Sequence, residues 1–148
     1  MTKKKNEYAI RNRIFYERRE LEDFLSKYNS VGDYLLRCMG TYPDIHAITD
    51  IYSKVELTYG QLITGIKETA SGLQALGVKK GDFIAIFSEN NGLWCMADQG
   101  IMRAGGITTA RGTGAPAEEL KYILEHSEAK YLILQNEKIL VKLIPFLR

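Results

Sequence analysis

A glycine-rich turn has the residue types and the spacing that could bind a phosphate-bearing cofactor. Gly112, Gly114 and Ala117 follow the pattern G-x-G-x-x-A, between a short β-rich run and a helical pattern. In dinucleotide-binding folds this spacing brings the backbone close to a pyrophosphate at a helix N-terminus. A small dinucleotide-binding protein is therefore one hypothesis for this chain.

The residues around this turn argue against a pyrophosphate there. Pro116 removes one amide donor from the start of the helix, and Glu118 and Glu119 place negative charge where the anion would bind. No acidic residue ends the next strand before Glu137, so the residue that would bind the ribose is also missing. The turn alone does not establish nucleotide binding.

Two other patterns have the right residue types but the wrong context. The segment Gly100 to Gly105 has half the spacing of a phosphate-binding loop, but Gly106 and Ile107 stand where Lys and Ser or Thr are required. A serine also follows a histidine at residues 126–127, but neighbouring side chains on a helix point apart. Neither pattern predicts a phosphate site or a catalytic triad.

The metal-ligating residues are too few for a zinc cluster. The chain has two histidines, His46 and His126, and two cysteines, Cys38 and Cys95. Both cysteines lie in apolar helical patterns, which is typical of buried thiols in a reducing compartment. His46 is interpreted as a strand residue. From the chemistry of the residues we therefore assign no catalytic residue, no cofactor-binding residue and no metal ligand.

Composition places the chain among single-domain proteins. Its 148 residues are enough for one domain with a core, and 20 Lys and Arg against 18 Asp and Glu leave a net charge of +2. This balance gives no indication of a nucleic-acid partner. The apolar runs are shorter than the roughly 20 residues that span a bilayer, and no apolar segment follows the N-terminal lysines. We expect a soluble, cytoplasmic domain.

The segment 58–88 is the organising element of the predicted fold. Thr58 and Gln61 form a capping-box pattern, and Gly77 supplies a left-handed stop. The apolar run 83–87 then has the length of a strand that is covered on both faces. Between the two helix ends, one apolar stripe recurs at helical spacing: Leu62, Ile66, Ala70, Leu73 and Leu76.

Helices and strands alternate along the rest of the chain, so the sequence predicts an α/β fold with a mainly parallel sheet, flanking helices and right-handed crossovers. An antiparallel hairpin is expected to precede the central helix. The predicted strands are 46–50, 55–57, 83–87, 107–110 and 129–134, and the predicted helices begin at Ser30, Thr58, Gly92, Pro116 and Lys138.

The first 28 residues differ in character from the rest. Seven basic and three acidic residues occupy the first twenty positions, and apolar residues recur at helical spacing. We predict a basic amphipathic helix over residues 1–28, followed by an α/β domain over residues 29–148. Such a helix can lie on an anionic membrane surface or dock on its own domain, so peripheral membrane contact is one expectation.

A family resemblance covers roughly residues 30 to 140. Its segments run in order as LTYGQL (57–62), ASGLQALGV (70–78), KGD (80–82), IAIFSEN (84–90), Trp94, ADQGIM (97–102), Gly105, RGT (111–113) and EEL-x-YIL-x-HSEA (118–129). The ordered set resembles the N-terminal part of the AMP-forming adenylating enzymes, specifically long-chain fatty acid:CoA ligases and acyl-carrier-protein ligases. The ADQG and RGT segments are most similar to the acyl ligase branch.

The resemblance implies a two-step reaction for the complete enzyme and a structural role for this chain. In this family a fatty acid attacks ATP to give acyl-AMP and pyrophosphate, and a thiol of CoA or of a carrier protein then displaces AMP, with Mg²⁺ as a further cofactor. The phosphate loop, the ribose-binding aspartate and the catalytic lysine of the family have no counterpart here. We therefore expect an N-terminal portion that is inactive alone and binds neither ATP, Mg²⁺ nor CoA tightly.

An alternative hypothesis is a non-catalytic interaction or membrane-surface module. A sheet without its later strands would present unpaired N–H and C=O groups at an edge. That edge could pair with the missing remainder of a ligase or with a second copy of the chain.

Overall fold

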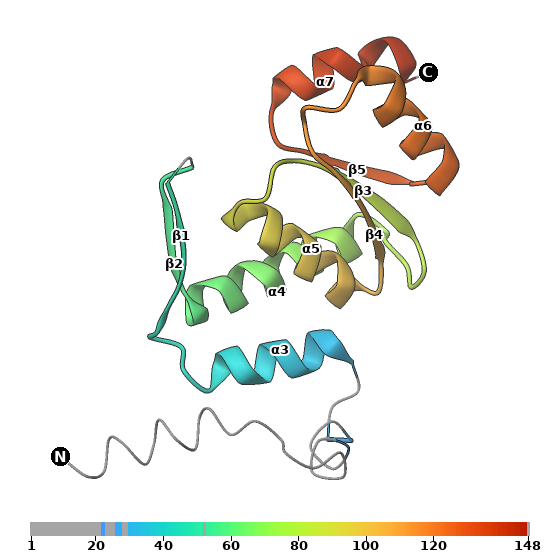
Figure 1. Cartoon of the computed structure of the whole chain (residues 1–148). Coiled ribbons are helices and arrows are strands. Elements are labelled where there is room, and N and C mark those ends of the chain that lie inside the picture. The colour runs from blue at the N-terminus through green and yellow to red at the C-terminus, as the bar shows by residue number, and fades with distance from the viewer. Residues whose placement is uncertain (1–21, 23–25, 28–29, 52, 148) are drawn as a thin grey trace, which may run out of the picture. The chain divides into compact units, whose positions relative to one another are not determined.

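The computed structural model describes residues 22, 26–27, 30–51 and 53–147 (Figure 1). The chain divides into two compact units, Met1–Leu35 and Leu36–Arg148. The predicted amphipathic helix over residues 1–28 lies almost entirely outside the described residues, and its boundary at residue 28 stays a prediction. Helix α3 (Val31–Gly40) follows Ser30, whose hydroxyl oxygen accepts the N–H of Asp33 at 3.1 Å.

A parallel sheet forms the centre of the second unit, as the alternating order predicts. Strand β3 (Phe83–Phe87) lies between β4 (Ile107–Arg111) and β5 (Tyr131–Leu134), and both neighbours run parallel to it. A separate antiparallel hairpin consists of β1 (His46–Asp50) and β2 (Val55–Thr58). The predicted α/β class and the predicted hairpin are both confirmed.

Helices cover both faces of β3, which explains its uninterrupted apolar sequence. Ile84 and Ile86 pack into the core with α4 and α5, whereas Ala85 and Phe87 pack with α6 and α7 on the other face. Figure 1 shows the two helix pairs on opposite sides of the sheet. The helices of these layers are α4 (Tyr59–Ala75), α5 (Gly92–Ala104), α6 (Ala117–Ser127) and α7 (Glu137–Leu143).

Both ends of α4 form as the sequence predicts. The Thr58 side chain accepts the N–H of Gln61, and the Gln61 side chain accepts the N–H of Thr58, which completes the capping box. At the other end Gly77 has a φ of 96°, and the N–H of Val78 donates to the carbonyl of Leu73 at 3.0 Å. This is a Schellman motif, which requires a left-handed residue after the helix.

The ends of the later elements differ slightly from the predicted boundaries. Pro116 is the N-cap of α6 and not its first residue, because its backbone is extended with a ψ of 154°. Strand β5 begins at Tyr131, two residues after the predicted start. Pro145 does not end the last helix directly: α7 gives way to a 3-10 turn over Ile144–Phe146 that contains the proline.

A buried carboxylate fixes the amino ends of β3 and β5. Asp82 precedes β3, and its side chain is 10% exposed. One oxygen accepts a hydrogen bond from Lys130 Nζ at 2.6 Å, and the other accepts the N–H of Lys79 at 2.8 Å. These hydrogen bonds and the positive charge of Lys130 lower the pKa of the Asp82 carboxyl. The ionised carboxylate therefore stabilises the folded state.

Unfolding of the chain is expected to depend on pH through Asp82. The folded state lowers the pKa of the Asp82 carboxyl. The stabilisation is therefore present at pH values above the ordinary pKa near 3.8, and it is lost as the pH falls through the lower pKa of the folded state. Urea unfolding between pH 5 and pH 2 should show a smaller pH dependence in Asp82→Asn than in the unchanged chain. Asp44→Asn, at an exposed aspartate, is the control and should keep the original dependence.

Candidate functional site

The carboxyl ends of β3 and β4 meet at a switch point in the sheet. The chain leaves β3 for α5 on one face of the sheet, and it leaves β4 for α6 on the opposite face. In open parallel sheets, the two loops at such a point diverge and leave a crevice where ligands bind. The crevice lies here between the β3–α5 loop (residues 88–91) and the β4–α6 loop (residues 112–116).

A cavity of about 920 Å³ occupies this crevice. The hairpin closes one side through Asp50 and Ser53, where the Asp50 carboxylate accepts the N–H of Ser53 at 3.2 Å. The indole of Trp94 adds an apolar wall. Other lining residues come from the three strand ends, among them Ser88, Glu89, Arg111, Gly112 and Gln135.

Gln135 links the loops after β3 and β5. Its side-chain oxygen accepts the backbone N–H of Glu89 at 2.7 Å and the hydroxyl of Ser88 at 3.4 Å. The Ser88 N–H donates to the carbonyl of Arg111 at 3.1 Å, which ties the same loop to the end of β4. All three strand ends are therefore joined by hydrogen bonds at the rim of the crevice.

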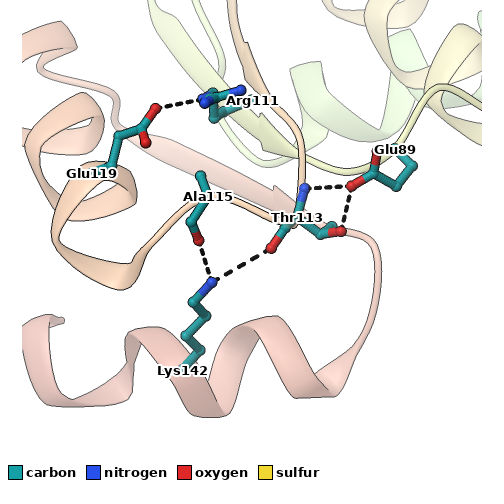
Figure 2. A network of polar contacts seen from close by, with 6 residues as sticks. All are labelled: Glu89, Arg111, Thr113, Ala115, Glu119 and Lys142. Atoms are coloured by element: carbon teal, nitrogen blue, oxygen red, sulfur yellow. Dashed lines mark hydrogen bonds and ion pairs between the residues drawn. The ribbon is translucent and has the colours of Figure 1, made fainter.

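The Glu89 carboxylate binds the β4–α6 loop across the crevice (Figure 2). Its Oε1 accepts the backbone N–H of Thr113 at 2.7 Å and also the Thr113 hydroxyl. These two bonds are the main reason why the pKa of Glu89 is below its ordinary value, and the nearby charge of Arg111 lowers it further. Glu89 is thus held ionised, with the loop as its donor.

Two further charged contacts hold the same loop. The Arg111 Nε donates to Glu119 at 2.6 Å, which joins the end of β4 to the first turn of α6 and raises the pKa of the guanidinium. Lys142 on α7 donates to the carbonyl of Thr113 at 3.5 Å and to that of Ala115. Figure 2 shows Glu89 and Lys142 reaching the loop from different directions.

The glycine-rich turn lies where a dinucleotide fingerprint requires, but its donors are already used. Gly112 follows β4 and the turn opens α6, yet the Thr113 amide donates to Glu89. A Cβ added at Gly112 would lie 3.4 Å from that carboxylate. An acidic side chain of the protein therefore occupies the position that a phosphate would need.

ATP does not fit the donor set of this crevice. Among the described residues that line the cavity, Arg111 is the basic one, and its guanidinium is paired with Glu119. A triphosphate would also meet the carboxylates of Glu89 and Asp50. The part of the chain that the structure describes contains no cluster of three or more His, Cys, Asp or Glu side chains that could hold a metal ion.

The remaining candidates from the sequence have local partners. His126 stacks on Tyr122 with ring centroids 5.3 Å apart, and the Ser127 hydroxyl donates to the carbonyl of Leu124. His46 occupies a strand position and lies 2.6 Å from the hydroxyl of Thr49. These contacts place neither histidine in a catalytic arrangement.

The glycine pattern and the thiols are also explained by packing. Gly100 to Gly105 closes α5, with Gly105 as the left-handed cap at a φ of 93°. Cys38 and Cys95 are free and half-buried, and burial raises the pKa of the Cys95 thiol. Such a thiol is less reactive than an exposed one.

The sequence shows no pairing for Glu89, and it does not single out Gln135 or Lys142. A signal for the first two was present, because both follow predicted parallel strands whose carboxyl ends share one edge of the sheet. No comparable signal exists for Lys142, whose partners are backbone carbonyls 27 and 29 residues away.

Comparisons with known proteins agree with the fold. The profile of the AMP-binding enzyme family matches residues 36–147. The chloroplastic long-chain-fatty-acid–acyl-carrier-protein ligase AEE15 of Arabidopsis thaliana is 37% identical over 113 residues, which cover 75% of this chain and 16% of that protein. The putative acyl-CoA synthetase YngI of Bacillus subtilis is 29% identical over 109 residues, or 74% of this chain and 20% of that protein.

A solved structure supports the same similarity. The inhibitor-bound N-terminal domain of FACL13 from Mycobacterium tuberculosis superposes with a TM-score of 0.67 at 29% identity. The superposition covers 72% of this chain and 27% of that one. The chain therefore spans about a fifth of the length of the curated relatives that it matches.

Within the described residues, none of the helices has the length and apolar character to span a membrane.

Proposed function

Because this chain belongs to the AMP-binding enzyme family, we propose that it forms the first part of the large domain of an ATP-dependent long-chain fatty acid ligase. The complete enzyme would form acyl-AMP from a fatty acid and ATP, and would then transfer the acyl group to a thiol. The observation that carries this proposal is the 37% identity to a long-chain-fatty-acid ligase over the α/β unit. CoA and an acyl-carrier protein are the two thiols that the relatives' names suggest.

The proposed contribution of this chain is structural. The crevice supplies an apolar wall and a rim of hydrogen-bonded loops, but its carboxylates oppose a triphosphate. ATP binding and adenylation would therefore depend on polypeptide beyond the α/β unit. We infer that the chain alone is inactive. The cytoplasmic location and the membrane contact of residues 1–28 stay predictions.

The surface of the last helix supports the idea of a missing partner segment. Ile139 and Leu143 of α7 are buried against the sheet, so the inner face is apolar. Four further apolar side chains are exposed on this helix and the following turn: Leu140, Val141, Ile144 and Leu147. Exposed apolar side chains that lie together can mark a surface that contacts another segment. The remainder of a ligase is the occupant that we propose for this face.

The proposed role can be tested by ATP–pyrophosphate exchange with palmitate. The isolated chain is expected to show no exchange. A chimera in which its α/β unit replaces the matching 113 residues of the Arabidopsis ligase AEE15 is expected to show exchange. Exchange by the isolated chain would place an adenylation site within it. A chimera that melts like the parent ligase but does not catalyse exchange would contradict the proposed role.

A further inference from the structure

The β4–α6 loop has little side-chain packing to hold it in place. Gly112 and Gly114 have no side chains, and a Cβ added at Gly114 would meet no atom within 4 Å. Glycine-rich segments lose more conformational entropy on ordering than other segments. Hydrogen bonds and the buried methyl group of Ala115 must therefore supply most of the order in this loop.

Those hydrogen bonds come from two elements that flank the loop. Glu89 accepts the N–H and the O–H of Thr113, while Lys142 donates to the carbonyls of Thr113 and Ala115. The loop donates to an anion and accepts from a cation, so both sets of bonds are charge-assisted and stronger than neutral ones. Figure 2 shows the two side chains and the loop between them.

Glu89 is itself positioned by a residue that follows β5. Its backbone N–H donates to Gln135 at 2.7 Å, directly after β5. The carboxylate that binds the β4–α6 loop therefore lies on a segment that follows β3 directly and is hydrogen-bonded to the end of β5. A shift of this side chain would move a loop that lines the crevice.

We propose that Glu89 is a positioning residue that holds the β4–α6 loop in place and so sets the shape of the crevice before any ligand enters. Glu89 also occupies the Thr113 amide, so a ligand in the crevice binds without that donor. Lys142 supports the same loop from α7. This inference concerns the chain itself and does not depend on the proposed ligase role.

Hydrogen exchange at the Thr113 amide tests the proposal directly, because Glu89 is its acceptor in the structure. In the full chain, Glu89→Ala is expected to accelerate exchange of this amide by about tenfold or more, through local opening of the loop. Glu89→Gln retains an acceptor oxygen without the charge. Its Thr113 exchange rate should therefore lie between the rate of the unchanged chain and that of Glu89→Ala. Glu118→Ala removes the same charge from an exposed site on α6 and should leave the rate unchanged.

The amide of Ile86 in the central strand separates local from global effects. Exchange at Ile86 should be unchanged in all variants. Unchanged exchange at Thr113 in Glu89→Ala would overturn the proposal. Equal acceleration at Thr113 and Ile86 would also overturn it, because the effect would then be global unfolding and not release of the loop.

Fluorescence of Trp94 gives a second readout. It is the one tryptophan of the chain, and it lines the same crevice. Glu89→Ala should increase quenching of its emission by acrylamide, whereas Glu118→Ala should not. Equal quenching in the two variants would mean that Glu89 does not control the shape of the crevice.

Discussion

Phe87→Ala is expected to lower the free energy of unfolding by about 3–5 kcal/mol, the usual cost of removing a buried phenyl group. Phe87 is fully buried at the end of β3, in the core that this strand shares with α6 and α7. Removal of the ring would leave a cavity under the crevice. Because domains of this size are stable by about 5–15 kcal/mol, the loss would be a large share of the total.

Urea unfolding followed by far-UV circular dichroism measures this loss. Phe83→Ala is a matched control, because it changes the same residue type at the other end of the same strand. Phe83 is 38% exposed, so the cost there should be less than half as large. Similar losses for the two variants would contradict the assignment of Phe87 to the core.

The central part of the fold could be predicted because its signals are local. The capping box at Thr58, the left-handed stop at Gly77 and the apolar run of β3 each lie within a few residues of the element that they define. The alternation of strands and helices then restricts the topology to a parallel sheet. The ends of α6 and α7 were less predictable, because a proline such as Pro116 fits several positions near a helix end.

The contacts of the crevice could not be predicted in the same way. Glu89 and Thr113 are 24 residues apart, and Glu89 and Gln135 are 46 residues apart. Each pair forms because parallel strands bring their carboxyl ends to one edge, and the sequence fixes neither the strand order nor the side-chain directions. In the sequence, Pro116, Glu118 and Glu119 oppose a phosphate at Gly112, and the structure adds a nearer carboxylate from Glu89.

Gly100→Val is expected to lower the free energy of unfolding by about 3 kcal/mol, at the upper end of the cost of overpacking. Helices α4 and α5 approach closely at this residue. A Cβ at Gly100 would lie 2.5 Å from the Thr69 Cγ2 and 2.6 Å from its Cβ. Threonine is stiff about its first side-chain torsion and cannot move aside easily.

A similar approach at Gly65 shows why the neighbour matters. A Cβ there would lie 2.5 Å from the sulfur of Met96, which is unbranched and can adopt another conformation. Gly65→Val should therefore cost less than Gly100→Val. Gly72→Ala, with no atom within 4 Å of the added Cβ, should instead stabilise the chain by about 0.5–1 kcal/mol.

The double variant Gly100→Val with Thr69→Gly identifies the source of the cost, because glycine lacks both the Cβ and the Cγ2 that the added side chain would meet. If the clash with Thr69 is responsible, Gly100→Val should cost less than half as much in the Thr69→Gly background as in the unchanged chain, and the two effects should not be additive. Additive losses in urea unfolding would mean that valine disturbs the helix by another route. Since α4 and α5 together cover one face of β3, a closer or wider spacing between them would change the packing on the central strand itself.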